Sequence, residues 1–248
     1  MKLLPRTVVA ETLDGLAESD PAAVRSRRDL QRIHRFMGTR GILAGALLRL
    51  AASRPPGTPL RLLELGAGDG SLMLGVAAKL QARWPPVHIT LLDRQNLVTR
   101  ATLDGYARLG WAAQSRVADV FDWAEGGRRN SARWDVIVTS LFLHHFDGPG
   151  LAMLLAAIES RTRRFMACEP RRARLALAGS FLVGAIGANA VTRHDAVLSV
   201  RAGFHGSELS GLWPGHRSFW TLREYSAGLF SHCFLAERSA PGSVGEWR

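Results

Sequence analysis

The segment LRLLELGAGDGSLMLGVAAKLQARW, residues 60–84, decides the fold that we predict for this chain. Residues 60–65 form a short apolar run that is typical of a buried strand, and residues 71–84 have the length and composition of a helix. Glycines within residues 66–70 permit a tight turn and a close approach of the backbone to a ligand. The start of the following helix presents unpaired N–H groups to an anionic group. This order of elements predicts a ligand site at the end of the strand.

Apolar runs and helical segments alternate on the C-terminal side of this turn. Strands are predicted at residues 87–93, 115–121, 134–142 and 164–170, and helices at residues 95–109 and 148–161. Near the end of the chain, residues 219–226 and 229–238 are separated only by Ala227-Gly228, a spacing typical of a β-hairpin. Alternating strands and helices imply right-handed crossovers. We therefore predict an α/β domain with a mostly parallel seven-stranded sheet, helices on both faces and an antiparallel C-terminal hairpin.

The first fifty residues are predicted to be helical. Asp20-Pro21 has the residue types of a helix start, and apolar residues recur at helical spacing across residues 30–37. A second helix is predicted over residues 42–52, before the breaker at residues 54–57. The apolar run at residues 175–191 is shorter than the ~20 residues of a membrane span. It is interpreted as a buried or lid helix, with contact to a membrane surface as the alternative.

The composition is that of a globular chain with an excess of arginine. Its 248 residues carry a formal charge of +11, which predicts an anionic partner such as nucleic acid or a membrane surface. Many arginines concentrate in residues 21–40 and 161–174, where a solvated charged face is the favoured interpretation. Cys168 and Cys233 lie far apart in apolar runs, which predicts buried thiols and no metal site. Acidic residues near the start argue against a secretory signal, so we expect a cytoplasmic protein.

Acidic residues stand where the predicted strands end. Glu64 lies at the end of the first strand, Asp93 ends the second and Asp119 ends the third, within Ala118-Asp119-Val120-Phe121. The fourth strand carries Ser140. In open α/β sheets, ligands bind beyond the carboxyl ends of the strands, so these side chains are expected at one site. A carboxylate after the second strand suits the two hydroxyls of a ribose, and one after the third suits the exocyclic amine of adenine.

These segments together resemble the class I methyltransferases that depend on S-adenosyl-L-methionine (SAM). The resemblance rests on ELGAGDG (64–70), LLD (91–93), VADVF (117–121) and WDVIVTSLFLHHF (134–146). It covers roughly residues 60–170 together with the terminal hairpin. It implies a Rossmann-like fold, with the glycine turn around the methionine part of SAM, one acid on the ribose and another on the adenine. The implied cofactor-binding residues are Glu64, Gly66, Ala67, Gly68, Asp93, Arg94, Asp119, Val120 and Ser140.

The resemblance also implies how the chain is organised. A single domain is expected over residues 1–248, with its SAM-binding core at residues 58–170. The flanking parts are expected to be a helical lid at residues 1–54, a substrate-covering segment at residues 171–218 and the hairpin at residues 219–238.

A nicotinamide or flavin dinucleotide is the main alternative ligand. Its fingerprint, GxGxxG, requires a Gly or Ala at the position where this chain has Ser71. The carboxylate of Glu64 would also repel a pyrophosphate, whereas it suits the ammonium and sulfonium groups of SAM. The sequence therefore favours SAM.

Several polar residues are candidates for the reaction and for contacts with the acceptor. His144 and His145 follow the fourth strand, where one of them would act as a base or orient the acceptor. The alternative is a structural role for both. Candidate acceptor contacts are Glu169, His194, His205 and Trp213. For Glu169 an ion pair with a neighbouring arginine is favoured over an acceptor contact, and for Trp213 core packing is at least as well supported.

The predicted function is methyl transfer to a hydroxyl or carbon of a small aromatic, quinone-like or polyketide-type acceptor, similar to methyltransferases of bacterial secondary metabolism. One alternative is a methyltransferase for nucleic acid or protein, which the positive charge favours. No Asn/Asp-Pro-Pro-aromatic tetrapeptide follows the fourth strand, and this argues against nucleic acid. The other alternative is a non-catalytic SAM-binding partner protein. We expect a monomer or homodimer that has neither a transmembrane span nor a metal.

Overall fold

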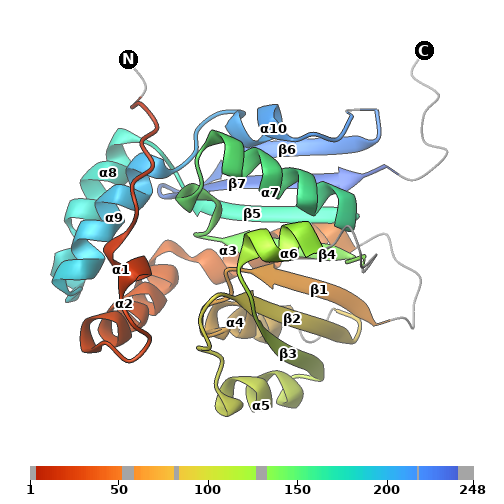
Figure 1. Cartoon of the computed structure of the whole chain (residues 1–248), viewed down its shortest axis with the longest axis horizontal. Coiled ribbons are helices and arrows are strands. Elements are labelled where there is room, and N and C mark those ends of the chain that lie inside the picture. Colours follow the sequence, from red (N-terminus) through yellow and green to blue (C-terminus); the bar gives the residue numbers. More distant parts are fainter. Residues whose placement is uncertain (1–3, 52–58, 81–83, 127–132, 217, 240–248) are drawn as a thin grey trace.

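The fold is built on one seven-stranded sheet (Figure 1). A computed structural model describes residues 4–51, 59–80, 84–126, 133–216 and 218–239. The strand order is β3-β2-β1-β4-β5-β7-β6. The strands are β1 (Leu60–Leu65), β2 (Val87–Asp93), β3 (Trp111–Val117), β4 (Val136–Ser140), β5 (Arg164–Pro170), β6 (Trp220–Ala227) and β7 (Ser231–Arg238). Strands β1 to β5 pair in parallel and β7 pairs antiparallel with β5 and β6, which confirms the predicted sheet and hairpin.

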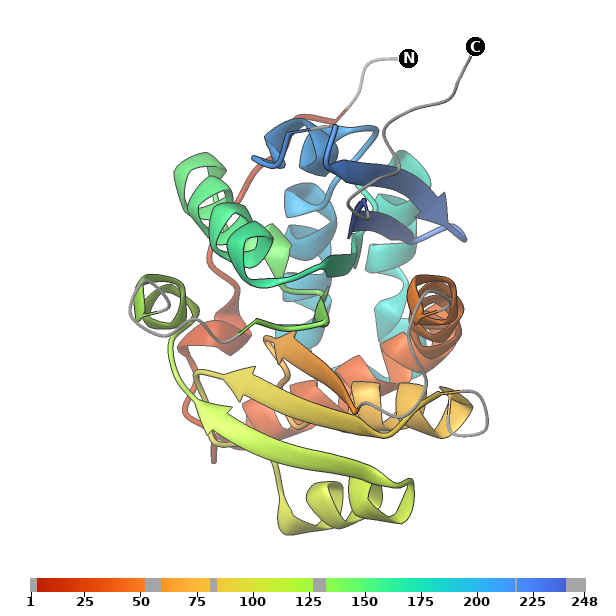
Figure 2. The ribbon, with the colours of Figure 1, turned by 90° about the vertical axis from the view of Figure 1, so that its right-hand side faces the viewer.

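Helices cover both faces of the sheet, as the buried runs of β1, β4 and β5 require (Figure 2). One face packs against α3 (Thr39–Ala51), α4 (Ser71–Leu80) and α5 (Arg100–Arg108). The other face packs against α6 (Val120–Gly126), α7 (Gly148–Arg161) and α10 (Glu208–Leu212). Leu62 points into the first core and Leu63 into the second, as the twofold alternation of a strand dictates.

The N-terminal helices begin and end at the residues that local chemistry favours. Helix α1 (Thr12–Gly15) precedes α2 (Pro21–Met37), where the Asp20 carboxylate accepts hydrogen bonds from the backbone N–H groups of residues 22 and 23. Gly38, with φ +69°, ends α2 in the left-handed conformation, and α3 begins at once at Thr39. The predicted second helix therefore starts three residues earlier than expected. It packs against the sheet, so only α1 and α2 lie where a lid would.

The segment between β5 and β6 holds α8 (Arg174–Phe181), the 3-10 turn η2 (Val183–Ile186) and α9 (Ala190–Ala202). The prediction of one helix over residues 175–191 is wrong, because Gly187, with φ +79°, and the N-cap Asn189 divide it. Helices α1, α2, α8 and α9 gather at one end of the sheet (Figure 1). None of the helices in the described ranges is long and apolar enough to cross a membrane.

Two strand predictions had the wrong bounds. Strand β3 runs over Trp111–Val117 rather than residues 115–121. It is an edge strand whose residues are mostly exposed, so it lacks the long buried apolar run that marks the central strands. Asp119 consequently follows the strand. Strand β4 stops at Ser140, since Leu141 adopts a positive φ of 49° that leads into the 3-10 turn η1 (Leu143–His145). The breaker at residues 54–57 lies outside the described residues.

Candidate functional site

The glycine-rich turn after β1 forms the floor of the site. Gly66, Gly68 and Gly70 have φ values of +71°, +56° and +73°, which L-residues rarely adopt. A Cβ atom on Gly66 would lie 2.3 Å from the Phe142 ring, so this position also needs glycine for packing. A Cβ atom on Gly68 would have no heavy atom within 4 Å. The turn is therefore packed against Phe142, just after β4, at Gly66 and is open to a ligand at Gly68.

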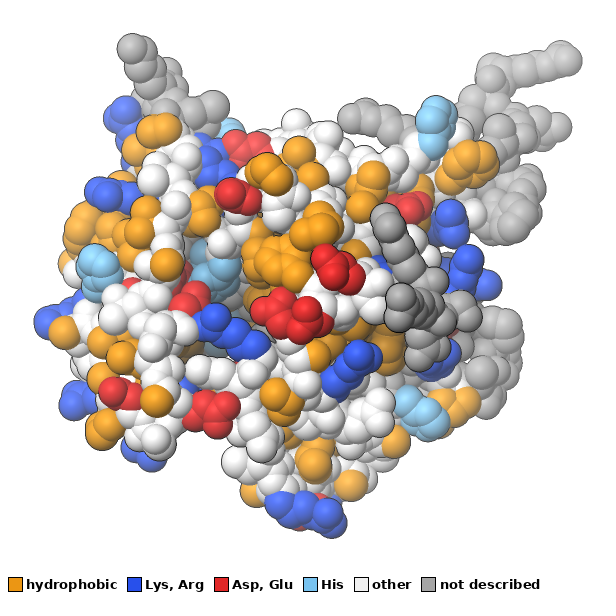
Figure 3. Space-filling view, viewed as in Figure 1, with side chains coloured by type: hydrophobic (Ala, Val, Ile, Leu, Met, Phe, Trp, Pro, Cys, Tyr) orange, Lys and Arg blue, Asp and Glu red, His pale blue; other side chains and the backbone are white. Residues whose placement is uncertain are grey.

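A cavity of about 460 Å³ lies above this turn, at the carboxyl ends of the parallel strands. Its size is that of a small-molecule site. All nine predicted cofactor-binding residues line this cavity, and so do both predicted histidines. The eleven residues are Glu64, Gly66, Ala67, Gly68, Asp93, Arg94, Asp119, Val120, Ser140, His144 and His145. On the face shown in Figure 3, a histidine side chain is visible in a hollow beside acidic side chains.

Three carboxylates around the turn provide acceptors for hydroxyl and amino groups. Asp93 accepts hydrogen bonds from the backbone N–H groups of Gly68 (2.8 Å) and Gln95 (2.9 Å), which fix its orientation. A carboxylate has about four lone-pair sites, so acceptor capacity is left for a ligand. Asp119 is exposed and accepts from the N–H group of Phe121 at 2.7 Å. Both side chains are therefore held by the backbone while they face the cavity.

Glu64 is the most unusual of these acids. It is buried, and its Oε2 has no hydrogen-bond partner among the described residues. Burial raises the pKa of Glu64 well above its ordinary value, and the nearby carboxylates of Asp69 and Asp93 raise it further. Ser140 Oγ is likewise buried in the cavity wall and unpartnered within the described part of the chain. Orphaned polar atoms beside an open glycine cradle fit a ligand that carries a cationic group and hydroxyls.

His144 is clamped between two glutamates from distant parts of the chain. Its Nδ1 lies 2.9 Å from Glu169 Oε2, and its Nε2 lies 3.3 Å from Glu11 Oε1. Glu169 also accepts hydrogen bonds from the backbone N–H groups of Phe142 and Leu143, each at 3.1 Å. Glu169 is fully buried behind His144 and does not line the cavity. Its carboxylate accepts hydrogen bonds from the 3-10 turn, and among the described residues it does not form the predicted ion pair with an arginine.

The two carboxylates decide the charge of His144. Burial alone would lower the pKa of His144, but the hydrogen bonds and negative charges of Glu11 and Glu169 raise it to about 9. Burial tends to raise the pKa of Glu11, yet the hydrogen bond and charge of His144 bring it below its ordinary value. Ser199 Oγ donates a further hydrogen bond to Glu11 Oε1. At neutral pH the cluster therefore holds an imidazolium between two carboxylates.

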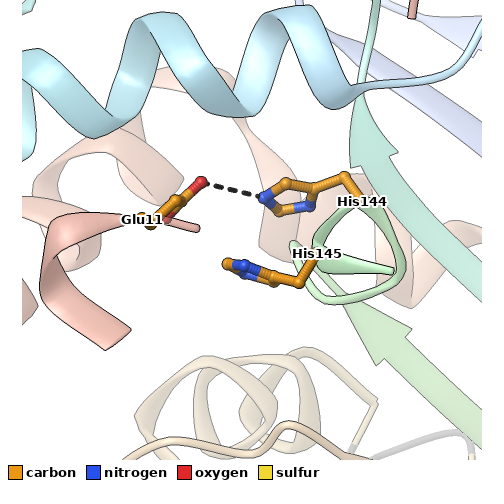
Figure 4. A group of neighbouring side chains, drawn as sticks. All are labelled: Glu11, His144 and His145. Atoms are coloured by element: carbon orange, nitrogen blue, oxygen red, sulfur yellow. Dashed lines mark hydrogen bonds and ion pairs between the residues drawn. The ribbon is translucent and has the colours of Figure 1, made fainter. Parts of the chain in front are cut away.

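His145 lies beside His144 and has its own acidic partner. The two rings are 4.2 Å apart, and both project from the turn toward the N-terminal segment (Figure 4). His145 Nδ1 lies 3.1 Å from Asp14 Oδ2, and Arg94 Nη2 lies 3.2 Å from Asp14 Oδ1. The pKa of Asp14 is lowered because these partners outweigh the effect of burial.

The histidines and Glu11 also have the residue types of a metal site. The ligand atoms of Glu11, His144 and His145 all lie within 4.8 Å of one another. In the structure, however, His144 Nε2 is bonded to Glu11, and the raised pKa of His144 places a proton there. A divalent cation would have to displace this proton. We therefore treat the cluster as a proton-binding site.

Three predicted acceptor residues lie away from the cavity. His194 is exposed on α9, and its neighbour Asp195 accepts hydrogen bonds from the N–H groups of Thr12 and Leu13, so the two residues form no base–acid pair. His205 precedes α10 and does not line the cavity. Trp213 is buried and stacks on Phe165 with 5.6 Å between ring centroids. Its indole is thus part of the core beneath β5.

The N-terminal segment supplies three site residues that the sequence did not reveal, Glu11, Asp14 and Gln31. Glu11 and Asp14 approach the histidines, and Gln31 on α2 donates a hydrogen bond of 2.7 Å to Asp69 in the glycine turn. His34, whose pKa burial lowers to about 4, also lines the cavity. Glu11 is separated from His144 by 133 positions, so no sequence motif could connect them. Asp69 lies in the ELGAGDG motif, but the motif alone indicated no role for it.

Comparison with solved structures places the fold among methyltransferases. No protein-family model matches the chain, and no curated protein matches its sequence. The plantazolicin methyltransferase BpumL in complex with SAH has a TM-score of 0.62 at 13% identity, over 89% of this chain and 92% of that one.

Two further methyltransferase structures cover less of their own chains. An O-methyltransferase family protein from Burkholderia thailandensis has a TM-score of 0.53 at 15% identity, over 88% of this chain and 62% of that one. The CurJ carbon methyltransferase has a TM-score of 0.51 at 15% identity, over 81% of this chain and 54% of that one. At these identities the likeness shows the fold, which is the one that the sequence predicted.

Proposed function

We propose that this chain is a SAM-dependent methyltransferase that acts on a hydroxyl or carbon of a small organic acceptor. The observation that carries the proposal is the convergence of Glu64, Asp93 and Asp119 on an open glycine turn in a cavity of about 460 Å³. The unpartnered carboxylate of Glu64 suits the cationic methionine part of SAM. The structural relatives include BpumL with bound SAH and an O-methyltransferase family protein, which supports the same ligand and reaction class.

The residues that would hold SAM follow from their positions. Gly66, Ala67 and Gly68 would bring the backbone close to the methionine part. Asp93, fixed by two backbone N–H groups, would accept from the ribose hydroxyls. Asp119 would accept from the adenine amine. When bound, SAM supplies an activated methyl group, and the chain has to position the acceptor, exclude water and manage a proton.

His144 and Glu169 would manage that proton. Methyl transfer to a neutral hydroxyl breaks the O–H bond and releases one proton. Because the pKa of His144 is about 9, the neutral form that can accept this proton at Nε2 is a minor species at neutral pH and becomes dominant above pH 9. In that form Glu169 fixes Nδ1 as the hydrogen-bearing nitrogen. Glu11 faces the same Nε2 and sets the pH at which this form is populated. Glu169 is then a positioning residue, since it is buried behind the imidazole.

The size of the cavity, about 460 Å³, favours a small acceptor over nucleic acid or folded protein. The cavity lies beneath α1 and α2, with Leu13, Leu30 and Gln31 among its lining residues. The structural neighbours include a plantazolicin methyltransferase and a carbon methyltransferase, which supports an acceptor other than nucleic acid.

Calorimetric titration with SAM and SAH tests the cofactor assignment directly. We expect binding to the wild-type protein and a loss of at least tenfold in Asp93→Asn, because a carboxylate hydrogen bond to ligand hydroxyls is worth about 1.5–3 kcal/mol. Asp104→Asn is the matched control, since Asp104 pairs with Arg100 on α5 and does not line the cavity. His144→Gln should keep SAM affinity and lose turnover of labelled methyl groups. A wild-type protein that binds neither SAM nor SAH would overturn the proposal.

A further inference from the structure

A second cavity of about 340 Å³ lies beside the first, between α2, α8, η2 and α9. Its lining is dominated by aliphatic and aromatic side chains, which include Ile33, Met37, Ala185, Ala196, Val200 and Phe230. Gly179 leaves the room that Phe230 occupies, because a Cβ atom there would lie 2.6 Å from the Phe230 ring. The space is thus built by a glycine and small alanines among larger apolar residues.

The two cavities meet at the proposed reaction centre. Five residues line both of them, namely Glu11, Leu13, Leu30, Leu141 and Ser199. Glu11 is the carboxylate that contacts His144 Nε2, so the inner end of the second cavity lies next to the imidazole. The outer end reaches the surface at Phe36 and Leu182, whose exposed fractions are 71% and 68%. A ligand can therefore extend from His144 to solvent along an apolar path.

The polar groups in the wall of the second cavity are already satisfied. Ser26 donates to Asn189, Thr192 donates to Asp29, and Ser180 donates to a backbone carbonyl of its own helix. Asp195 accepts from two backbone N–H groups of α1. Among the described residues, none of the buried unpartnered side-chain atoms belongs to this cavity, whereas the first cavity holds several. Because the polar side chains named above are held by partners within the protein and the rest of the lining is mostly aliphatic or aromatic, the second cavity suits hydrocarbon.

We propose that the acceptor is an amphiphile, with its nucleophilic head beside His144 and an alkyl tail in the second cavity. The proposal rests on the proposed methyltransferase function, since it names the acceptor class of that site. The tail would pack between α2 and α9, and its far end would leave the protein near Phe36 and Leu182. Burial of the tail would supply the binding energy that holds the head against the activated methyl group.

A homologous series of 4-alkylphenols, from methyl to heptyl, tests the proposal by calorimetry on the SAH-loaded protein. We expect the affinity to rise about fourfold per methylene, the value for burying a CH₂ group, until the cavity is filled. In Ala196→Phe the added ring should occupy the cavity and abolish the dependence on chain length. Ala185→Phe, at an exposed position of the cavity lining, should shorten the longest tail that binds and places little demand on folding.

The controls separate this proposal from the proposed function. Ala101→Phe adds the same ring on the exposed face of α5 and should retain the wild-type chain-length dependence. All variants should bind SAH as the wild type does, because no residue changed lines the first cavity. SAH binding together with an affinity for phenols that does not change with chain length would overturn the tail proposal alone. Tighter binding of a flat polycyclic phenol than of the alkylphenol of equal carbon number would also overturn the tail proposal. Failure of the wild-type protein to bind SAH would instead overturn the methyltransferase proposal.

Discussion

Replacing Glu11 by glutamine tests how the charge of His144 is set. The Glu11→Gln change removes one of two carboxylates that face the imidazole, and it keeps the length of the side chain and one acceptor oxygen. The pKa of His144 is about 9 in the folded protein, against an ordinary value of 6.5. This difference corresponds to about 3 kcal/mol, at 1.36 kcal/mol per pKa unit. The side chains of Glu169 and Glu11 are 0% and 12% exposed, so little of this energy is lost to screening by solvent.

The variant should lose roughly half of this energy, or about 1–2 kcal/mol, because Glu169 remains in place. Its His144 pKa should then fall by about one unit or more. A histidine whose folded pKa is raised stabilises the protein fully below its ordinary pKa of 6.5, and this contribution is lost as the pH rises through about 9. The wild type should therefore be more stable than Glu11→Gln below pH 6.5, and the gap should shrink as the pH rises through about 9.

Two measurements follow these changes without knowledge of the acceptor. The His144 pKa can be read from an NMR titration of its imidazole, assigned with His144→Gln. The free energy of unfolding can be measured by urea denaturation at several pH values. Glu125→Gln, on the exposed surface of α6, is the matched control and should follow the wild type. An imidazole that titrates at the same pH in wild type and Glu11→Gln, or a stability gap that is constant across pH, would refute the reasoning.

Three further predictions concern the turn, the buried glutamate and metal ions. Gly66→Ala should lower the free energy of unfolding by about 2–4 kcal/mol, because the added Cβ would clash with the Phe142 ring and the φ of Gly66 is positive. Gly68→Ala should lower it by only about 1–2 kcal/mol, because only the positive φ opposes the change. Urea denaturation measures both losses, and equal losses would contradict the packing argument. Glu169→Gln should lower the pKa of His144, which NMR can follow, and should leave the SAH affinity measured by calorimetry within about twofold of the wild type. A large loss of SAH affinity would mean that Glu169 acts on the cofactor site. EDTA should leave SAH binding and methyl transfer unchanged, and inhibition reversed by a divalent cation would show that the histidine and glutamate cluster binds metal.

The sequence alone determined the parts of the molecule that are encoded locally. A strand, a glycine turn and a helix follow one another within residues 60–80, so the turn that forms the floor of the site could be predicted. The acids at Asp93 and Asp119 could be placed at one site because parallel strands end at the same edge of the sheet. Even with wrong bounds for β3, the prediction kept Asp119 at that edge.

Two predictions failed, one because local helix-ending signals were missed and one because a long-range contact decides the structure. Residues 175–191 look like one apolar helix, but α8 and α9 are separate because Gly187 and Asn189 interrupt the hydrogen bonding between them. Trp213 was predicted as a candidate acceptor contact. It lies in the core instead, where it stacks on Phe165, a residue 48 positions earlier in the sequence.

Only the tertiary structure decided the environment of His144 and the shape of the acceptor site. The carboxylate of Glu11 reaches the imidazole across 133 positions of the sequence, and the carboxylate of Glu169 reaches it across 25. The second cavity is formed where α2 packs beside α8 and α9, and its lining residues come from segments that are far apart in the chain. A pKa and a cavity depend on which side chains surround a point in space, and that neighbourhood is fixed only when distant segments pack together.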